Sequence, residues 1–184
     1  GLGRGGGGDD ALIASSGSHL LMGDEGDDSL VATSGTVELD GGAGDDSISV
    51  AAGAAAIVHF ARGSGTDTVD LAGFREHAIG EIRLGAGIAV SQVAIRREAG
   101  DLVLSIAGTT DSVRVRSGFS GDQTAVSRIT LADGGSLDPG AILALARQGS
   151  ALDDVLVGSA GDDTLSGLGG NDVGDVACGG DVAV

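Results

Sequence analysis

The chain lacks most of the residues from which proteins build an aromatic core or a basic surface. Its 184 residues contain no Lys, Trp or Tyr, only three Phe, and a single Pro and Cys. Without Lys there is no Walker loop, and Cys178 alone excludes an internal disulfide framework. Its isolation favours an idle thiol over a bridge between chains. The net charge of −17 disfavours nucleic acid and anionic membranes as partners and favours a divalent cation.

Long apolar runs are absent as well. No stretch approaches the roughly 20 apolar residues that span a bilayer, and no basic start followed by an apolar segment marks a signal peptide. Acidic, Gly-rich chains without aromatic residues are often disordered. Two features argue against disorder: 41% of the residues are hydrophobic, and the aliphatic residues recur in register with Asp.

What the chain does have is a nine-residue repeat, Gly-Gly-x-Gly-x-Asp-x-aliphatic-x. The repeat is complete from Gly41 to Ser49, and so strict a period is typical of a stacked repeat architecture. Residues 5–13 also match, with Asp10 and Leu12 in the two informative places, and four further copies that depart from the repeat cover residues 23–31, 62–70, 158–166 and 167–175.

Each copy has the chemistry of a calcium site. Gly at positions one, two and four tolerates positive backbone φ, so the turn curls its carbonyl oxygens inward. Asp at position six adds a carboxylate, and oxygen ligands of both kinds suit the hard Ca²⁺ ion. Position eight points one aliphatic side chain into the core, because side chains alternate between the two faces of a strand.

In these nonapeptides the sequence resembles the repeats-in-toxin family of secreted bacterial proteins. The resemblance implies a parallel β-roll, a right-handed coil in which two nonapeptides make one full turn. Repeats n and n+2 then stack, and calcium lies between their turns. The fold class we expect is all-β, with two blocks of parallel β-roll that flank a small antiparallel β-rich segment with one short helix.

Strong and weak copies alternate in the first block, residues 1–70, which predicts one calcium-loaded edge and one dry edge. The weak copies have His19, Val37 and Ala55 in place of the Asp. About three ions are expected between successive strong copies, with Asp28 and Asp46 serving two ions each through their two oxygens. The predicted ligand-bearing residues are Gly6, Gly8, Asp10, Gly23, Gly26, Asp28, Gly41, Gly42, Gly44, Asp46, Gly63, Gly65 and Asp67.

The stacking rule also predicts two rows of core side chains. One row is expected to contain Leu12, Leu30, Ile48 and Val69, and the other Leu21, Leu39 and Ile57. The repeat frame slips by three residues, and we place the slip after Val58.

The last block, residues 149–184, keeps the same phase and is expected to hold one or two ions. Leu152 in place of a turn Gly and Gly174 in place of the core aliphatic weaken it. Its predicted ligand-bearing residues are Asp154, Gly158, Gly161, Asp163, Gly170, Asp172 and Asp181.

The middle segment, residues 71–148, lacks the repeat. Period-two patterns predict strands at 93–97, 101–106 and 112–115 with hairpin turns between them, and a further strand at 129–131. Asp138 followed by Pro139 predicts the start of a short helix over 141–147. This segment is similar to a β-rich segment found between repeat blocks in hemolysin-type proteins. We expect it to cap the first roll and to cover its open strand edge.

No catalytic motif is present, so we expect no enzyme. The Gly1–Gly6 match to G-x-G-x-x-G neither follows a strand nor opens a helix, and His19, His59 and His77 have no candidate nucleophile beside them. We read His19 as an ordinary turn residue.

The leading interpretation is a calcium-binding repeat module of a secreted bacterial protein, located outside the cell or at its surface, that folds when it binds calcium. The ending Asp181-Val182-Ala183-Val184 resembles that of type I secretion substrates, but it equally completes the last repeat. Two alternatives stay open: an extracellular structural protein that associates head to tail, and part of a secreted enzyme whose catalytic domain precedes Gly1.

Overall fold

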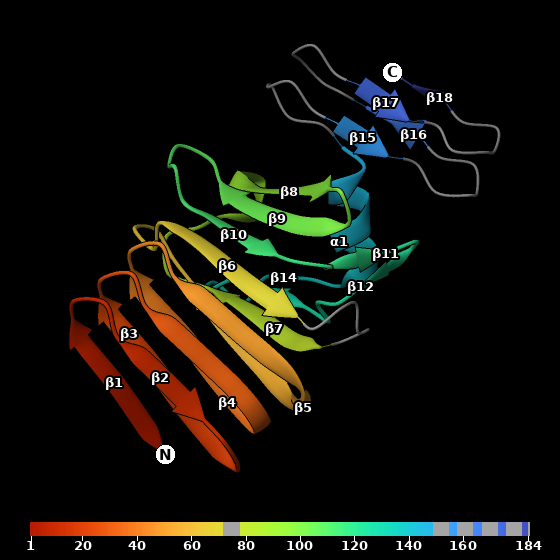
Figure 1. The fold of residues 1–184 in the computed structure, drawn as a ribbon. Helices are drawn as coiled ribbons and strands as arrows, with labels where there is room; N and C mark the ends of the chain where they lie inside the picture. The colour runs from red at the N-terminus through yellow and green to blue at the C-terminus, as the bar shows by residue number, and fades with distance from the viewer. Residues whose placement is uncertain (72–77, 149–154, 158–163, 167–172, 176–181, 184) are drawn as a thin grey trace.

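In the computed structural model the repeats coil into a flattened solenoid of two facing parallel sheets (Figure 1). The structure describes residues 1–71, 78–148, 155–157, 164–166, 173–175 and 182–183. The first block forms six strands. They are β1 (Leu2–Gly7), β2 (Ala11–Ala14), β3 (Ser18–Glu25), β4 (Ser29–Ala43), β5 (Ser47–Phe60) and β6 (Thr66–Leu71).

Stacking between repeats n and n+2 is confirmed by the strand register. Leu12 pairs with Leu30, which pairs with Ile48, which in turn pairs with Val69. This first sheet contains β2, the first half of β4, the first half of β5, and β6. The second sheet contains β1, β3 and the second halves of β4 and β5. The predicted row of position-eight side chains on the first sheet is therefore confirmed.

The second predicted row is only partly correct. Leu21 pairs with Leu39 as expected, but Leu39 pairs with Val58, while Ile57 pairs with Glu38 on the outer face. The cause is a register shift between Ala32 and Ser34, where β5 has one extra residue at the edge. One residue of the three-residue slip thus enters before Val58, which places Val58 in the core and turns Ile57 outward.

The middle segment continues both sheets of the roll. Strand β7 (Ile79–Leu84) pairs in parallel with β5, and β10 (Ser112–Val115) pairs in parallel with β6. Strands β8 (Val93–Glu98) and β9 (Asp101–Ile106) extend the first sheet in antiparallel fashion, while β13 (Ile129–Thr130) and β14 (Ser136–Leu137) extend the second. The middle segment thus covers the open edge of the roll and joins it through parallel pairs, while its antiparallel pairs lie within the segment itself.

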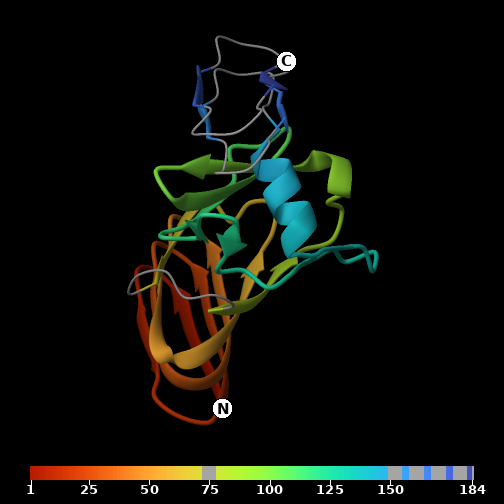
Figure 2. The ribbon, with the colours of Figure 1, turned by 90° about the vertical axis from the view of Figure 1, so that its right-hand side faces the viewer.

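Short elements complete the middle segment. The turn η1 (Val90–Gln92) precedes β8, and β11 (Phe119–Ser120) pairs with β12 (Gln123–Thr124). Helix α1 (Pro139–Ala146) begins as predicted, because the Asp138 carboxylate accepts a hydrogen bond of 2.8 Å from the Ala141 N–H. Figure 2 shows α1 beside the β8–β9 hairpin, and α1 contacts β8.

The last block repeats the stacking rule. Strand β15 (Val155–Val157) pairs in parallel with β17 (Val173–Asp175), and β16 (Thr164–Leu165) pairs with β18 (Val182–Ala183). Leu156 and Leu165 are buried, and Leu156 lies opposite Gly174, which offers no side chain to the core.

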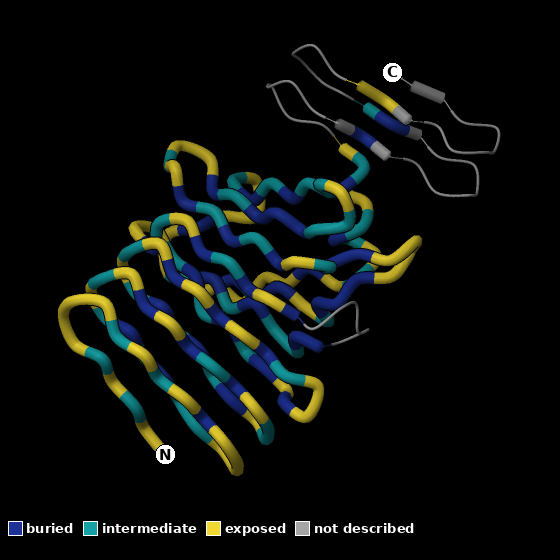
Figure 3. Tube along the Cα trace, in the orientation of Figure 1, coloured by how far each residue is buried: buried dark blue, intermediate teal, exposed yellow. Residues whose placement is uncertain are grey.

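A single apolar core runs through the roll and the middle segment. It extends from Ala14 to Ala146 and contains almost exclusively aliphatic side chains, with Phe60 and Phe119 as the aromatic exceptions. Figure 3 shows buried and exposed residues alternating along the strands, with exposed residues at the turns. The boundary near residue 70 is therefore a change of sequence pattern within one continuous core. Among the described residues, no helix has the length and apolar character needed to cross a bilayer.

Candidate calcium site

The turns of the strong repeats lie along one edge of the roll, which we call the acidic edge. It is formed by the turns that contain Asp10, Asp28, Asp46 and Asp67. Each of these residues is tied to the next by a hydrogen bond from backbone to carboxylate. The Asp10 N–H donates to Asp28 Oδ1 at 2.7 Å, the Asp28 N–H to Asp46 Oδ1 at 2.8 Å, and the Asp46 N–H to Asp67 Oδ1 at 3.1 Å.

Three of these carboxylates are taken almost completely out of water. Asp28, Asp46 and Asp67 are each 2% exposed. Oδ2 of Asp28 and Oδ2 of Asp46 are buried and have no hydrogen-bond partner among the described residues. A buried carboxylate oxygen without a partner is strongly unfavourable unless a positive charge or a donor meets it. Oδ1 of Asp28 and Oδ1 of Asp46 each accept an amide proton, and it stays a prediction that each of these residues serves two ions, one per oxygen.

Gly is required at position one because a side chain there would collide with neighbouring oxygen atoms, and not because the backbone adopts a positive φ. A Cβ placed on Gly23 would lie 2.1 Å from Asp28 Oδ2 and 2.2 Å from the Gly41 carbonyl oxygen. A Cβ on Gly41 would lie 2.1 Å from Asp46 Oδ2. The sequence argument assigned positive φ to this position as well. The structure instead shows that these glycines leave room for carboxylate and carbonyl oxygens to converge.

Positive φ is confirmed at positions two and four. Asp24, the one departure in the second strong copy, also has a φ of 78°, and its carboxylate pairs with Arg4 at 2.5 Å. Four of these glycines, Gly26, Gly42, Gly44 and Gly65, also approach the neighbouring turn, and a Cβ on Gly44 would lie 2.2 Å from the Gly26 carbonyl oxygen. The predicted residues with positive φ are Gly6, Gly8, Gly26, Gly42, Gly44, Gly63 and Gly65.

Burial and mutual repulsion change the acidity of this edge. Burial raises the pKa of Asp67 to about 8, and the negative charges of Asp46, Asp45 and Asp40 act in the same direction. Burial likewise raises the pKa of Asp46, with repulsion from Asp28 as a further cause. The backbone hydrogen bonds to both carboxylates oppose these shifts without cancelling them. The raised pKa values show that no positive charge at this edge compensates the buried carboxylates.

A second, outer row of carboxylates accompanies the inner one. Asp9, Asp27 and Asp45 are exposed, as predicted for the first member of each Asp pair. They also bridge the turns, because the Asp27 N–H donates to Asp9 Oδ1 at 3.0 Å and the Asp45 N–H to Asp27 Oδ1 at 2.8 Å. The inner and outer carboxylates both bridge neighbouring turns, but they differ in burial and in direction, because in the outer row the later amide donates to the earlier carboxylate.

Asp111 ends the row, and the sequence analysis missed it. It directly precedes β10 and is 7% exposed. Its Oδ2 accepts from the Gly63 N–H at 2.9 Å and its Oδ1 from the Gly65 N–H at 3.1 Å. Burial by itself would raise the pKa of Asp111, but these two amides and the Thr109 hydroxyl hold it below its ordinary value. The only sequence signal was an Asp just before a predicted strand.

The residues of the acidic edge fit calcium. Every converging group is an oxygen, either from a carboxylate or from a backbone carbonyl, as the hard Ca²⁺ ion prefers. No group of three or more His, Cys, Asp or Glu side chains converges within the described part of the chain, so carbonyl oxygens must complete any such site. Asp28 Oδ2 with the Gly41 carbonyl, and Asp46 Oδ2 in the next turn, are the groups best placed to hold an ion.

The turns at the opposite edge, as far as the structure describes them, contain no buried carboxylates. None of the buried polar residues in the described ranges lies in its turns. Val37 is a core residue, Ala55 is exposed in β5, and His19 lies in β3, where its Nε2–H donates to the Ser16 carbonyl at 2.6 Å. His19 is therefore a strand residue and not the turn residue that the repeat pattern predicted. In the described part of the first block the buried carboxylates therefore lie on one edge, and it stays a prediction that this edge is loaded with calcium while the other is dry.

The ligand-bearing residues predicted in the last block lie outside the described residues. They are Asp154, Gly158, Gly161, Asp163, Gly170, Asp172 and Asp181.

Comparisons with known proteins agree with this geometry. The RTX calcium-binding nonapeptide repeat (4 copies) matches residues 22–54 and 148–177. The haemolysin-type calcium binding protein related domain matches residues 101–140, which contain β9, β10 and the start of α1. No curated protein matches the chain. With these repeats coiled into a parallel β-roll, the chain belongs to the hemolysin-type proteins with RTX calcium-binding nonapeptide repeats.

Proposed function

We propose that the chain is a calcium-dependent folding module of an exported bacterial protein, without catalytic activity of its own. The observation that carries the proposal is the pair of buried, unpartnered oxygens, Asp28 Oδ2 and Asp46 Oδ2. Bound Ca²⁺ would supply the positive charge that these carboxylates lack. The residues that would hold it lie on successive turns, so binding and stacking of the turns are one process.

The energetics favour a loose chain when calcium is scarce. With a net charge of −17 and 36 Gly among 184 residues, closing the acidic edge concentrates like charges and orders very flexible segments. Affinities of roughly 10⁻⁴ to 10⁻³ M, as in extracellular modules, would keep the chain open in a low-calcium cytoplasm and close it outside. Type I secretion is the route that we propose, on the strength of the repeats. We propose about three ions in the first block and one or two in the last.

A calcium titration followed by circular dichroism tests this function. Without calcium we expect little β structure, and with millimolar calcium a cooperative gain. Asp28→Asn should raise the calcium concentration at the midpoint by at least about tenfold, because a charge-assisted ligand is lost at a buried site. Asp27→Asn makes the same change of charge on the exposed neighbour and should shift the midpoint less than about twofold. Full β structure in a chelator would contradict the proposal.

A second candidate function is calcium-dependent self-association into a structural assembly. It is favoured by the first turn of the roll, where β1 and β2 each have only one partner strand among the described residues. Leu2 and Ile13 beside these edges are 67% and 68% exposed. Unpaired strands with exposed apolar side chains are templates for a further strand, and a head-to-tail contact between chains would continue as a filament.

A further inference from the structure

A cavity of about 430 Å³ lies beside the last Gly-rich turn, away from the carboxylates that face the proposed ions. Its walls are formed by β8, β9, β10 and the turn between β9 and β10. The volume falls within the range of small-molecule sites, roughly 300 to 1,000 Å³. The polar residues that line it are Arg96, Ser105, Thr109, Thr110, Asp111 and Ser112.

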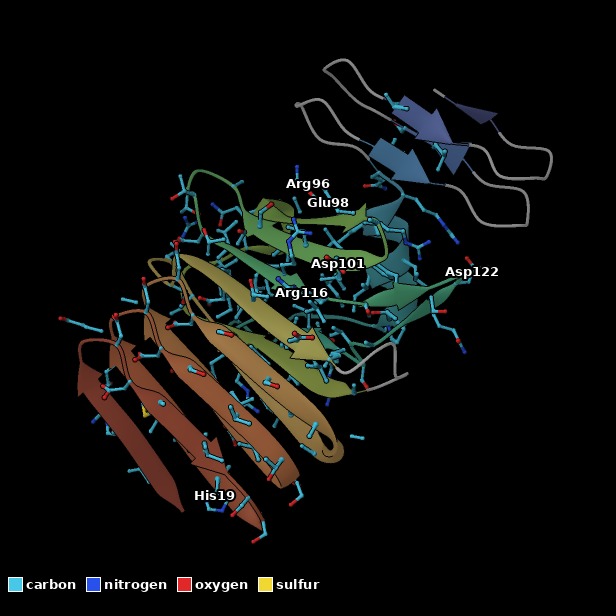
Figure 4. The ribbon with its side chains drawn as sticks, viewed as in Figure 1. His19, Arg96, Glu98, Asp101, Arg116 and Asp122 are labelled. Atoms are coloured by element: carbon cyan, nitrogen blue, oxygen red, sulfur yellow. The ribbon has the colours of Figure 1, made fainter. Side chains whose placement is uncertain are left out.

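Arg96 is the unusual member of this lining. Its Nε is buried and has no hydrogen-bond acceptor among the described residues. Its Nη2 lies 3.3 Å from Glu98 Oε1, but Glu98 is already bound through its other oxygen by Arg114. Figure 4 shows Arg96 and Glu98 close together on β8, far from His19 at the other end of the roll. Arg96 thus retains one buried donor, its Nε–H, that no described residue satisfies, which is costly.

Hydroxyl groups lie close to this guanidinium. Ser105 and Ser112 pair directly across β9 and β10, and Ala94 lies opposite Ser105 on β8, so the three side chains share one face. Ser105, Ser112 and Thr110 use their hydroxyls in no hydrogen bond within the described part of the chain. The Asp111 carboxylate, by contrast, is fully engaged with Gly63 and Gly65.

We propose that this cavity binds a monovalent carboxylate that carries hydroxyl groups. Arg96 lines the cavity, and its positive charge and unsatisfied Nε–H suit a carboxylate oxygen, which accepts a charge-assisted hydrogen bond. Ser105, Ser112 and Thr110 face the hydroxyls of the ligand, and the small Ala94 leaves room for its carbon chain. A single charge is favoured because Arg96 shares its own charge with Glu98 in a chain of net charge −17.

The test is an NMR titration of the calcium-loaded chain with D-glycerate, a carboxylate with two hydroxyls. We expect saturable shifts of the backbone amides of residues 94–96 and 105–112, with a dissociation constant in the millimolar range. Arg96→Ala should weaken binding at least about tenfold, since a charge-assisted hydrogen bond and the positive charge beside it are lost. Arg116→Ala removes a more exposed arginine, which does not line the cavity, and should change the affinity less than about twofold.

Further probes separate the outcomes. Glycerol, which has the hydroxyls and no carboxylate, should not bind. Sulfate should bind at least about fivefold more weakly than D-glycerate, and equal binding would overturn the assignment of a carboxylate. Unchanged binding in Arg96→Ala, or shifts spread over the acidic edge, would overturn the site itself. A circular dichroism spectrum of Arg96→Ala in calcium shows that the variant is folded, so a loss of binding is not a loss of structure.

Discussion

Asp67 links the acidic edge to pH. Its pKa is raised to about 8 from an ordinary value of 3.8, because burial and neighbouring carboxylates disfavour its charge. A raised pKa on a carboxylate means that the metal-free fold prefers the protonated group. This contribution to stability is complete below about pH 3.8 and is lost as the pH rises through about 8. At neutral pH a calcium ion therefore competes with a proton for Asp67.

We predict that calcium binding at pH 7 releases a proton from Asp67, and that the release disappears near pH 9. Calorimetry in two buffers with different ionisation enthalpies measures it, because released protons add the heat of the buffer. Asp67→Asn should abolish the difference between buffers, whereas Asp70→Asn, an exposed neighbour, should keep it. Heats at pH 7 that do not depend on the buffer would contradict this account.

How far single residues were predictable depends on what fixes them. The position-six Asp and the position-eight aliphatics follow from the repeat, and the structure stacks Leu12, Leu30, Ile48 and Val69 as expected. The reason for Gly23 and Gly41 was not predictable in this way. It lies in the distance to the neighbouring turn, which depends on the assembled coil and not on a local preference for positive φ.

At the level of elements, the turn between β9 and β10 stabilises the end of the roll. Asp111 accepts hydrogen bonds from two amides of the last Gly-rich turn, and β10 then pairs with β6. In this way the middle segment supplies the contacts that a further repeat would have made. The turn at Gly63–Gly65 is held by a carboxylate from a residue more than forty positions away in the sequence.

We predict that Asp111→Asn lowers the free energy of unfolding in excess calcium by about 1 to 3 kcal/mol, since one partly buried amide loses its acceptor on the buried Asp111 side chain. Urea unfolding followed by circular dichroism measures the loss. Asp122→Asn provides the control: Asp122 pairs with Arg147 at the surface, where ion pairs contribute roughly 0 to 1 kcal/mol. Equal losses in the two variants would show that Asp111 does not hold the turn.

The elements of the middle segment were predictable where their pattern is local. The hairpin β8–β9–β10 follows from period-two alternation, and α1 follows from Asp138 and Pro139. Strand β7 was missed, because Gly80 and Glu81 interrupt the period-two pattern of Ile79–Leu84, and the strand is fixed by its parallel partner β5. The displacement of Ile57 has a similar origin, since the extra residue enters at a turn whose Ala-rich sequence gives no sign of it.

At the scale of the whole molecule, the open first turn determines whether the chain assembles. We predict that, if the second candidate function holds, light scattering grows with calcium and with protein concentration. Ile13→Lys places a charge beside the open edge and should suppress this growth. Val90→Lys changes an apolar side chain of comparable exposure, 52%, on the surface away from that edge and should leave the growth intact. A monomer at all calcium concentrations would reject assembly.

The architecture as a whole was predictable because the period fixes it. A strict nonapeptide admits one way of stacking, and both the first and last blocks pair residues eighteen positions apart. What the period did not reveal is that the middle segment shares the core of the roll. That continuity depends on parallel strand pairs between distant residues, such as Thr66 with Ser112, which no local sequence pattern predicts.

The bonds of the inner row all run in the same direction. The amide of Asp10 reaches Asp28, that of Asp28 reaches Asp46 and that of Asp46 reaches Asp67, and Asp111 then accepts from the amides of the last Gly-rich turn. The outer row runs the opposite way, from the Asp27 amide to Asp9 and from the Asp45 amide to Asp27, so each coil is tied to the coil before it and to the coil after it. Duplicating or deleting eighteen residues in this series would change the length of the roll and the number of calcium sites without requiring changes at either end. Insertions and deletions of this size therefore offer a simple route, in evolution and in protein engineering, to rolls of different length.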